Sequence, residues 1–117
     1  MRRHITLAAL AAVSLSGCYS KVPPIAQGGP KNVELATPYF DDQVKQRFPV
    51  GSDEEKLRAE FHRESFRISE TNDPHVGYQY IATYRENGIC RVSWTVHWNA
   101  DQGKITNTTA AYTQTCP

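Results

Sequence analysis

The side chains that could carry acid–base or metal chemistry in this chain are few, and none lies in a catalytic spacing. His62, His75 and His97 are too scattered to form a zinc motif. Asp73 with His75 is the acid–base pair that an enzyme hypothesis would need, and it lies in a stretch of turn-forming residues. There is no Gly-x-Ser-x-Gly elbow and no phosphate-binding loop. The sequence therefore predicts a non-catalytic protein without a metal or cofactor.

Cys18, the first of three cysteines, ends a segment with the layout of a secretory signal. Arg2 and Arg3 give a positive start, and residues 5–15 are almost wholly apolar. This apolar run is shorter than the roughly 20 residues needed to cross a bilayer. Its end, Leu15-Ser16-Gly17-Cys18, resembles the lipobox of bacterial lipoproteins. The resemblance implies that the signal is cleaved before Cys18, whose thiol is diacylated and whose new amino group usually gains a third chain.

Acylation of Cys18 would fix the location of the mature chain. Each buried CH₂ contributes about 0.8 kcal/mol, so two or three acyl chains hold a protein stably on a membrane. In Gram-negative lipoproteins an aspartate after the cysteine commonly marks inner-membrane retention, whereas Tyr19 stands here. We therefore expect a lipid anchor in the outer membrane and a domain that faces the periplasm.

The charge balance argues against nucleic acid as a partner. Arg2 and Arg3 leave with the signal, so the 13 Lys and Arg residues fall to 11, against 12 acidic residues. A nearly neutral chain has no basic excess with which to neutralise phosphates. The remaining length, roughly 100 residues, suits one domain.

Residues 18–37 predict a lipidated tether between the membrane and that domain. Prolines fix extended conformations and glycines add freedom, and this stretch holds Pro23, Pro24, Gly28, Gly29 and Pro30. We expect residues 1–17 to be the signal peptide, 18–37 to be the tether and 38–117 to be the folded domain.

Two short helices are predicted at the start of the domain. Thr37-Pro38 has the form of a helix start, and the first helix would end at Pro49. Its apolar stripe is Phe40, Val44 and Phe48. A capping box at residues 52–55 would start the second helix with Ser52 as the cap, and the buried side of that helix would carry Leu57 and Phe61.

The rest of the chain has the pattern of an antiparallel sheet. Residues 70–74 predict a loop, and strand-forming residues occupy 76–85, 89–99 and 104–115, with 66–68 as a candidate fourth strand. Together with the helices, this predicts an α+β fold in which two short helices pack on a three- to four-stranded antiparallel meander.

The turn at residues 86–88 sets which face of the sheet each aromatic side chain occupies. A three-residue loop, Glu86-Asn87-Gly88, places the aromatics together on the face that covers the helices. The predicted pairs are Tyr84 with Cys90, Tyr80 with Trp94, Tyr78 with Val96, and Val76 with Trp98. On that face Trp94, Trp98, Tyr78 and Tyr80 are either part of the core or a candidate binding surface.

Cys90 and Cys116 remain once Cys18 is acylated. They would lie near one end of adjacent strands, and an oxidising periplasm permits a disulfide between them. We expect this bridge, because two thiols without a nearby histidine lack the ligands of a metal site.

The order of these features resembles that of a known family. A lipobox, a proline-rich tether, a short helix, the helix start Gly51-Ser52-x-x-Glu55-x-Leu57 and an aromatic meander are similar to the SmpA/OmlA (BamE-like) family of small outer-membrane lipoproteins. Over residues 38–117 the resemblance implies a binding role without catalysis, in envelope or outer-membrane assembly, through contacts with other proteins. The alternative function is inhibition of a periplasmic or host hydrolase such as lysozyme.

Overall fold

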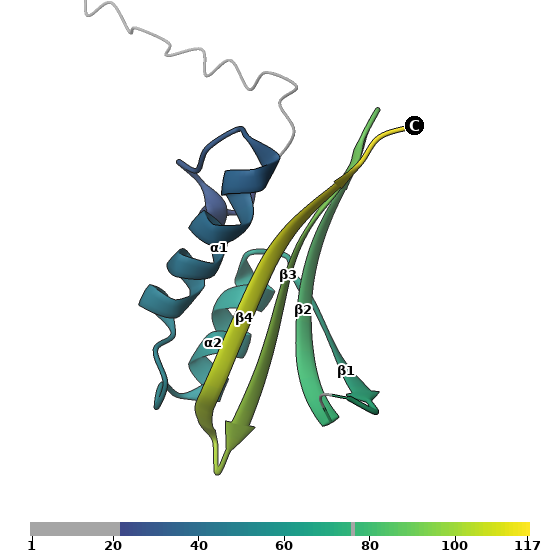
Figure 1. The fold of residues 1–117 in the computed structure, drawn as a ribbon. Coiled ribbons are helices and arrows are strands. Elements are labelled where there is room, and N and C mark those ends of the chain that lie inside the picture. Colours follow the sequence, from purple (N-terminus) through teal and green to yellow (C-terminus); the bar gives the residue numbers. More distant parts are fainter. Residues whose placement is uncertain (1–21, 76) are drawn as a thin grey trace, which may run out of the picture.

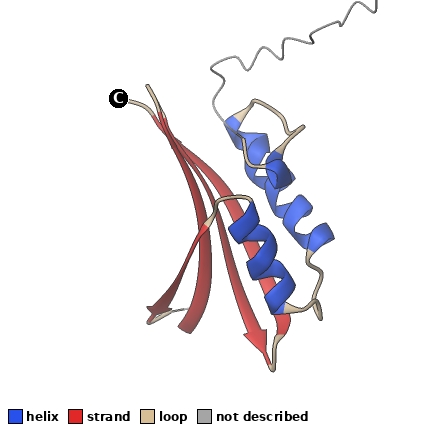
Figure 2. Ribbon diagram, turned by 180° about the vertical axis from the view of Figure 1, so that it is seen from behind, coloured by secondary structure: helices blue, strands red, loops and turns tan. Residues whose placement is uncertain are grey.

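Two helices cover one face of a four-stranded antiparallel sheet in the computed structural model of this chain (Figures 1 and 2). The structure describes residues 22–75 and 77–117; the predicted signal peptide, Cys18 and Val76 lie outside these residues. The strands follow one another across the sheet in chain order, β1-β2-β3-β4. The elements are the 3₁₀ turn η1 (Pro24–Ala26), helices α1 (Val33–Arg47) and α2 (Glu54–Arg63), and strands β1 (Arg67–Asp73), β2 (Gly77–Asn87), β3 (Arg91–Asp101) and β4 (Lys104–Thr115). The predicted α+β class and the fourth strand are confirmed.

The core lies between the helices and the sheet. The two predicted helix stripes are buried: Phe40, Val44 and Phe48 on α1, and Leu57 and Phe61 on α2. The sheet contributes Ala82, Trp94, Val96, Trp98, Ile105 and Ala110. Between Asn99 and Ala100 of β3 the register with β4 shifts by one residue, which turns Ile105 onto the core face. In the part of the chain that the structure describes, no helix has the length and apolar character needed to span a bilayer.

The predicted tether is wrong from residue 22 onward, because residues 22–37 belong to the fold. Ile25 is 2% exposed, and its backbone N–H donates to Glu64 Oε1 on α2 at 2.7 Å. Glu64 Oε2 in turn lies 2.8 Å from Arg47 Nη1, so one carboxylate joins the N-terminal segment to both helices. The Tyr39 hydroxyl donates to the Gln27 carbonyl oxygen at 2.8 Å. Prolines and glycines direct this segment along a fixed, packed path instead of leaving it as a spacer.

Both helices start at residues other than those predicted. Helix α1 starts at Val33, where Asn32 Oδ1 accepts from the Glu34 N–H at 2.9 Å, and Pro38 lies inside the helix. The cap of α2 is Asp53 rather than Ser52, whose hydroxyl donates to the Pro49 carbonyl oxygen at 2.6 Å. A local contact with Pro49 therefore uses the Ser52 hydroxyl that a capping box would have directed to the start of α2.

The β2–β3 pairing differs from the predicted register by four residues. Tyr80 pairs with Trp98 and Tyr84 with Trp94, so the hairpin loop is Gly88-Ile89-Cys90 rather than residues 86–88. The strands run on through Asn87, and Cys90, the last residue of the loop, is bonded to Cys116. Because four is an even number, every side chain keeps its predicted face, and the aromatics do come together.

Strand β1 is longer than predicted. Residues 70–73 pair with residues 77–80 of β2, so the predicted loop over 70–74 is reduced to the turn that begins at Pro74. Turn-forming residue types here do not stop the strand, because β2 supplies a hydrogen-bonding partner along its whole length.

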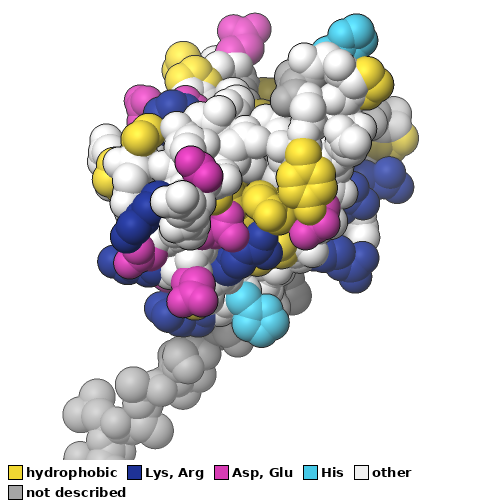
Figure 3. Space-filling view, turned by 90° about the horizontal axis from the view of Figure 1, so that it is seen from below, with side chains coloured by type: hydrophobic (Ala, Val, Ile, Leu, Met, Phe, Trp, Pro, Cys, Tyr) yellow, Lys and Arg dark blue, Asp and Glu magenta, His cyan; other side chains and the backbone are white. Residues whose placement is uncertain are grey.

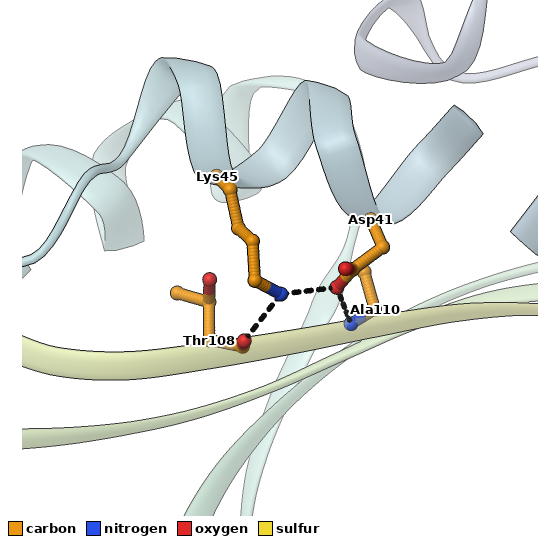
Figure 4. Close-up of polar contacts among 4 residues, drawn as sticks. All are labelled: Asp41, Lys45, Thr108 and Ala110. Atoms are coloured by element: carbon orange, nitrogen blue, oxygen red, sulfur yellow. Dashed lines mark hydrogen bonds and ion pairs between the residues drawn. The ribbon is translucent and has the colours of Figure 1, made fainter. Parts of the chain in front are cut away.

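Helix α1 covers the outer edge of β4 with polar side chains. Asp41 Oδ1 accepts from the Ala110 backbone N–H at 2.9 Å, and Lys45 Nζ donates to the Thr108 carbonyl oxygen at 2.8 Å (Figure 4). One turn earlier, the Thr37 hydroxyl donates to the Tyr112 carbonyl oxygen at 3.1 Å, and the Tyr112 N–H donates back to it at 3.0 Å. Side chains four residues apart on α1 therefore bond to backbone groups two residues apart on β4. Because these backbone groups are occupied, another strand cannot pair with this part of the β4 edge.

Candidate functional site

The predicted disulfide is present. Cys90 and Cys116 are bonded, with their Cα atoms 4.2 Å apart. The bond joins the β2–β3 hairpin loop to the residue that follows β4. It therefore holds the C-terminal end of β4 against this loop. Its role here is structural.

The candidate binding residues separate into two groups. Trp94 is 7% exposed and Trp98 is 0% exposed, so both tryptophans belong to the core. Tyr78 is 48% exposed, and Tyr80 is half-buried beside it. Only the tyrosine half of the predicted surface is accessible to a partner.

Tyr78 and Tyr80 belong to a layered stack of side chains. We call this group the Arg58 patch, and its members are Tyr78, Tyr80, Arg58, Glu54 and Glu70. The Arg58 guanidinium lies over the Tyr80 ring, 4.5 Å from its centroid. Tyr80 stacks beneath on Trp98 at 5.6 Å, and Tyr78 meets the edge of Tyr80 at 5.3 Å. A buried tryptophan therefore fixes the position of an accessible tyrosine and arginine.

Two carboxylates set the charge of the Arg58 patch. Glu54 Oε1 lies 3.0 Å from Arg58 Nε, while Glu54 Oε2 accepts from the Trp98 indole N–H at 3.4 Å. On the neighbouring strand, the hydrogen bond between Glu70 and the Tyr78 hydroxyl raises the pKa of Tyr78 to about 12. Tyr78 therefore stays protonated at neutral pH, donates its O–H to Glu70 and cannot act as a base.

The Arg58 patch lies at the end of the sheet where helix α2 begins. Arg58 and Glu54 come from the first turns of α2, Glu70 from β1, and the tyrosines from the start of β2. Seen from below, this end shows a ring-shaped hydrophobic side chain at the surface with acidic and basic side chains next to it (Figure 3). Tyrosine and arginine over a rigid base are typical of protein-contact hot spots.

The histidines singled out in the sequence lie in three different parts of the described fold. The His75 backbone N–H donates to Asp73 Oδ1 at 2.7 Å, which is a turn contact rather than a catalytic pair. His62 is exposed on α2, and His97 lies on the sheet face away from the helices. Within residues 22–75 and 77–117, no three His, Cys, Asp or Glu side chains are grouped so that they could hold a metal ion.

Three members of the Arg58 patch were not predicted from the sequence. Glu54 and Arg58 are four apart on α2, a spacing that predicts an ion pair on one helix face. No local signal places that pair over Tyr80, since this depends on where α2 crosses the sheet. Glu70 was assigned to a loop, so its place beside Tyr78 required the correct length of β1.

Comparisons of the chain with protein-family models, with curated proteins and with solved structures found no match.

Proposed function

We propose that this chain is a bacterial lipoprotein, anchored in the outer membrane through acyl chains on Cys18. Its periplasmic domain acts as a non-catalytic interaction module in envelope assembly or maintenance. The observation that carries the proposal is the sequence Leu15-Ser16-Gly17-Cys18, placed directly after a charged start and an apolar run. The resemblance to the SmpA/OmlA family supports the same envelope role.

The Arg58 patch supports an interaction role for the domain. Tyr78 offers an accessible ring and a protonated hydroxyl, and Arg58 offers a guanidinium whose charge is partly balanced by Glu54. Such groups bind a protein surface by stacking and hydrogen bonding. Because Tyr80 and Trp98 hold both groups in place, a partner would pay little ordering entropy to meet them.

Intact-mass measurement of the mature protein from a Gram-negative host tests the anchor. We expect a chain that begins at Cys18 with the added mass of two or three acyl chains. The Cys18→Ser variant is the control and should remain an uncleaved, unmodified precursor. A wild-type chain that keeps residues 1–17, or that starts at an unmodified Cys18, refutes the lipoprotein assignment.

Photocrosslinking in intact cells tests the interaction role. A photoreactive phenylalanine analogue at Tyr78 should capture one defined envelope protein. The matched position is Gln46, an exposed residue of α1 outside the Arg58 patch. Arg58→Ala should weaken the Tyr78 crosslink without changing expression. Capture of the same random neighbours from both positions would refute the role of the patch, and capture of a hydrolase that the domain inhibits would favour the inhibitor alternative.

A further inference from the structure

The end of the domain away from the Arg58 patch carries an apolar side chain that the fold does not use. Ile89, at the tip of the β2–β3 hairpin, is 90% exposed. Val22, where the described chain begins, is 38% exposed, and it lines an open hollow of about 540 Å³ together with Ile89, Val92 and Trp94. The hairpin tip and the start of the described chain therefore lie at the same end of the molecule (Figure 1).

The hairpin tip is fixed in place rather than a loose loop. Cys90, next to Ile89, is bonded to Cys116 beyond β4, and the Gly88 N–H donates to the Cys90 carbonyl oxygen at 3.3 Å. A single exposed isoleucine is common on protein surfaces and carries no meaning by itself. Ile89 differs from such residues because it lies at the same end of the domain as Val22, which is only four residues from Cys18, the predicted lipid attachment site.

Packing of residues 22–36 leaves a very short link to the predicted anchor. Cys18 and Val22 are four residues apart, and a chain extends by at most ~3.6 Å per residue, so the link spans no more than about 14 Å. A domain held this closely cannot stand off the lipid surface as a long tether would allow. With Cys18 acylated, the end that carries Val22 and Ile89 is the end of the domain held closest to the membrane.

We propose that the β2–β3 hairpin tip contacts the lipid surface and that Ile89 inserts among the headgroups beside the acyl anchor. This inference rests on the proposed acylation of Cys18. Inserted apolar side chains add to the affinity of an acyl anchor and fix the orientation of the domain on the membrane. Tyr78 lies nine residues along β2 from Asn87, so at about 3.3 Å per residue the Arg58 patch would be held roughly 30 Å further from the lipid.

Tryptophan fluorescence with brominated phospholipids tests the contact. Ile89→Trp is compared with Val50→Trp, which places the same side chain at a 76%-exposed position in the turn before α2. Each acylated protein is purified from bacterial membranes and reconstituted into phosphatidylethanolamine–phosphatidylglycerol vesicles, with and without bromine on the acyl chains. Wild-type protein supplies the background from Trp94 and Trp98.

We expect the Ile89→Trp emission to shift to the blue and to be quenched by brominated lipid, while the Val50→Trp emission does neither. Equal, unquenched emission from both variants on an acylated protein overturns the docking inference and leaves the lipoprotein assignment standing. A blue shift without quenching means that protein covers the tip, from a second copy or another partner, and also overturns it. An unmodified Cys18 in the mass spectrum instead overturns the lipoprotein assignment itself.

Discussion

Replacing Asp41 with alanine tests how α1 is held on the sheet. Asp41 Oδ1 is the acceptor for the Ala110 N–H of β4 at 2.9 Å and also lies 2.6 Å from Lys45 Nζ. Ala110 is 2% exposed, so its N–H has little access to water when the carboxylate is removed. Lys45 keeps its bond to the Thr108 carbonyl oxygen and is half exposed, so it can be solvated.

The magnitude follows from these two contacts. A hydrogen bond to a charged acceptor contributes about 1.5–3 kcal/mol when its loss leaves a buried donor unpaired. The exposed ion pair between positions i and i+4 adds at most about 0.5 kcal/mol. We therefore expect Asp41→Ala to lower the free energy of unfolding by about 2–3 kcal/mol. This is a large part of the total for a domain whose stability falls in the usual range of about 5–15 kcal/mol.

Urea unfolding followed by tryptophan fluorescence measures this loss, and amide exchange at Ala110 locates it. Asp41→Asn keeps an acceptor at the same place and should lose clearly less than Asp41→Ala. Asp42→Ala is the matched control, because Asp42 is exposed and makes none of the contacts to β4. If Asp41→Ala unfolds at the same urea concentration as Asp42→Ala, or leaves exchange at Ala110 unchanged, the polar contacts do not hold the helix.

Three further predictions concern the N-terminal segment, the disulfide and the Arg58 patch. Gly29→Ala should destabilise the domain in the same urea assay, because the added Cβ would lie 2.6 Å from the Tyr39 ring; Gly88→Ala, whose Cβ meets its nearest atom at 3.7 Å, should be tolerated. Reduction of the disulfide, which closes a loop of 26 residues, should lower the free energy of unfolding by about 3 kcal/mol, and an unchanged midpoint would contradict this. Glu70→Gln should lower the pKa of Tyr78 from about 12 toward its ordinary value of 10, as followed by phenolate absorbance against Tyr78→Phe; no movement would mean that Glu70 is not the cause.

The face of each strand was predictable because strand periodicity is a local property. Trp94 and Trp98 alternate with polar neighbours, and an even register error could not move them off the helix-covered face. The register itself depends on where the hairpin loop falls, and the loop is Gly88-Ile89-Cys90 rather than residues 86–88.

The N-terminal segment was misassigned because the same composition suits both a spacer and a packed turn. Gly29 is required by the close approach of Tyr39, and Ile25 fills a site that both helices help to form. Neither role can be predicted from the sequence before the positions of α1 and α2 in the fold are known. For the same reason Tyr78 was predicted as a surface candidate but Arg58 was not, because its position over Tyr80 depends on how α2 crosses the strands.

The two ends of the sheet carry the exposed side chains Ile89 and Tyr78. Along the β4 edge the backbone is bonded to α1, and the sheet face away from the helices is rich in threonine and serine, as in the 2.6 Å hydrogen bond between Ser93 and Thr113. The β4 edge therefore does not offer free backbone groups to another strand, and the polar sheet face does not suit an apolar partner. A four-residue link to Cys18 would turn the Ile89 end toward lipid. It follows that a protein partner approaching from the periplasm would meet the Arg58 patch first, and that lengthening the link should weaken orientation without touching the patch.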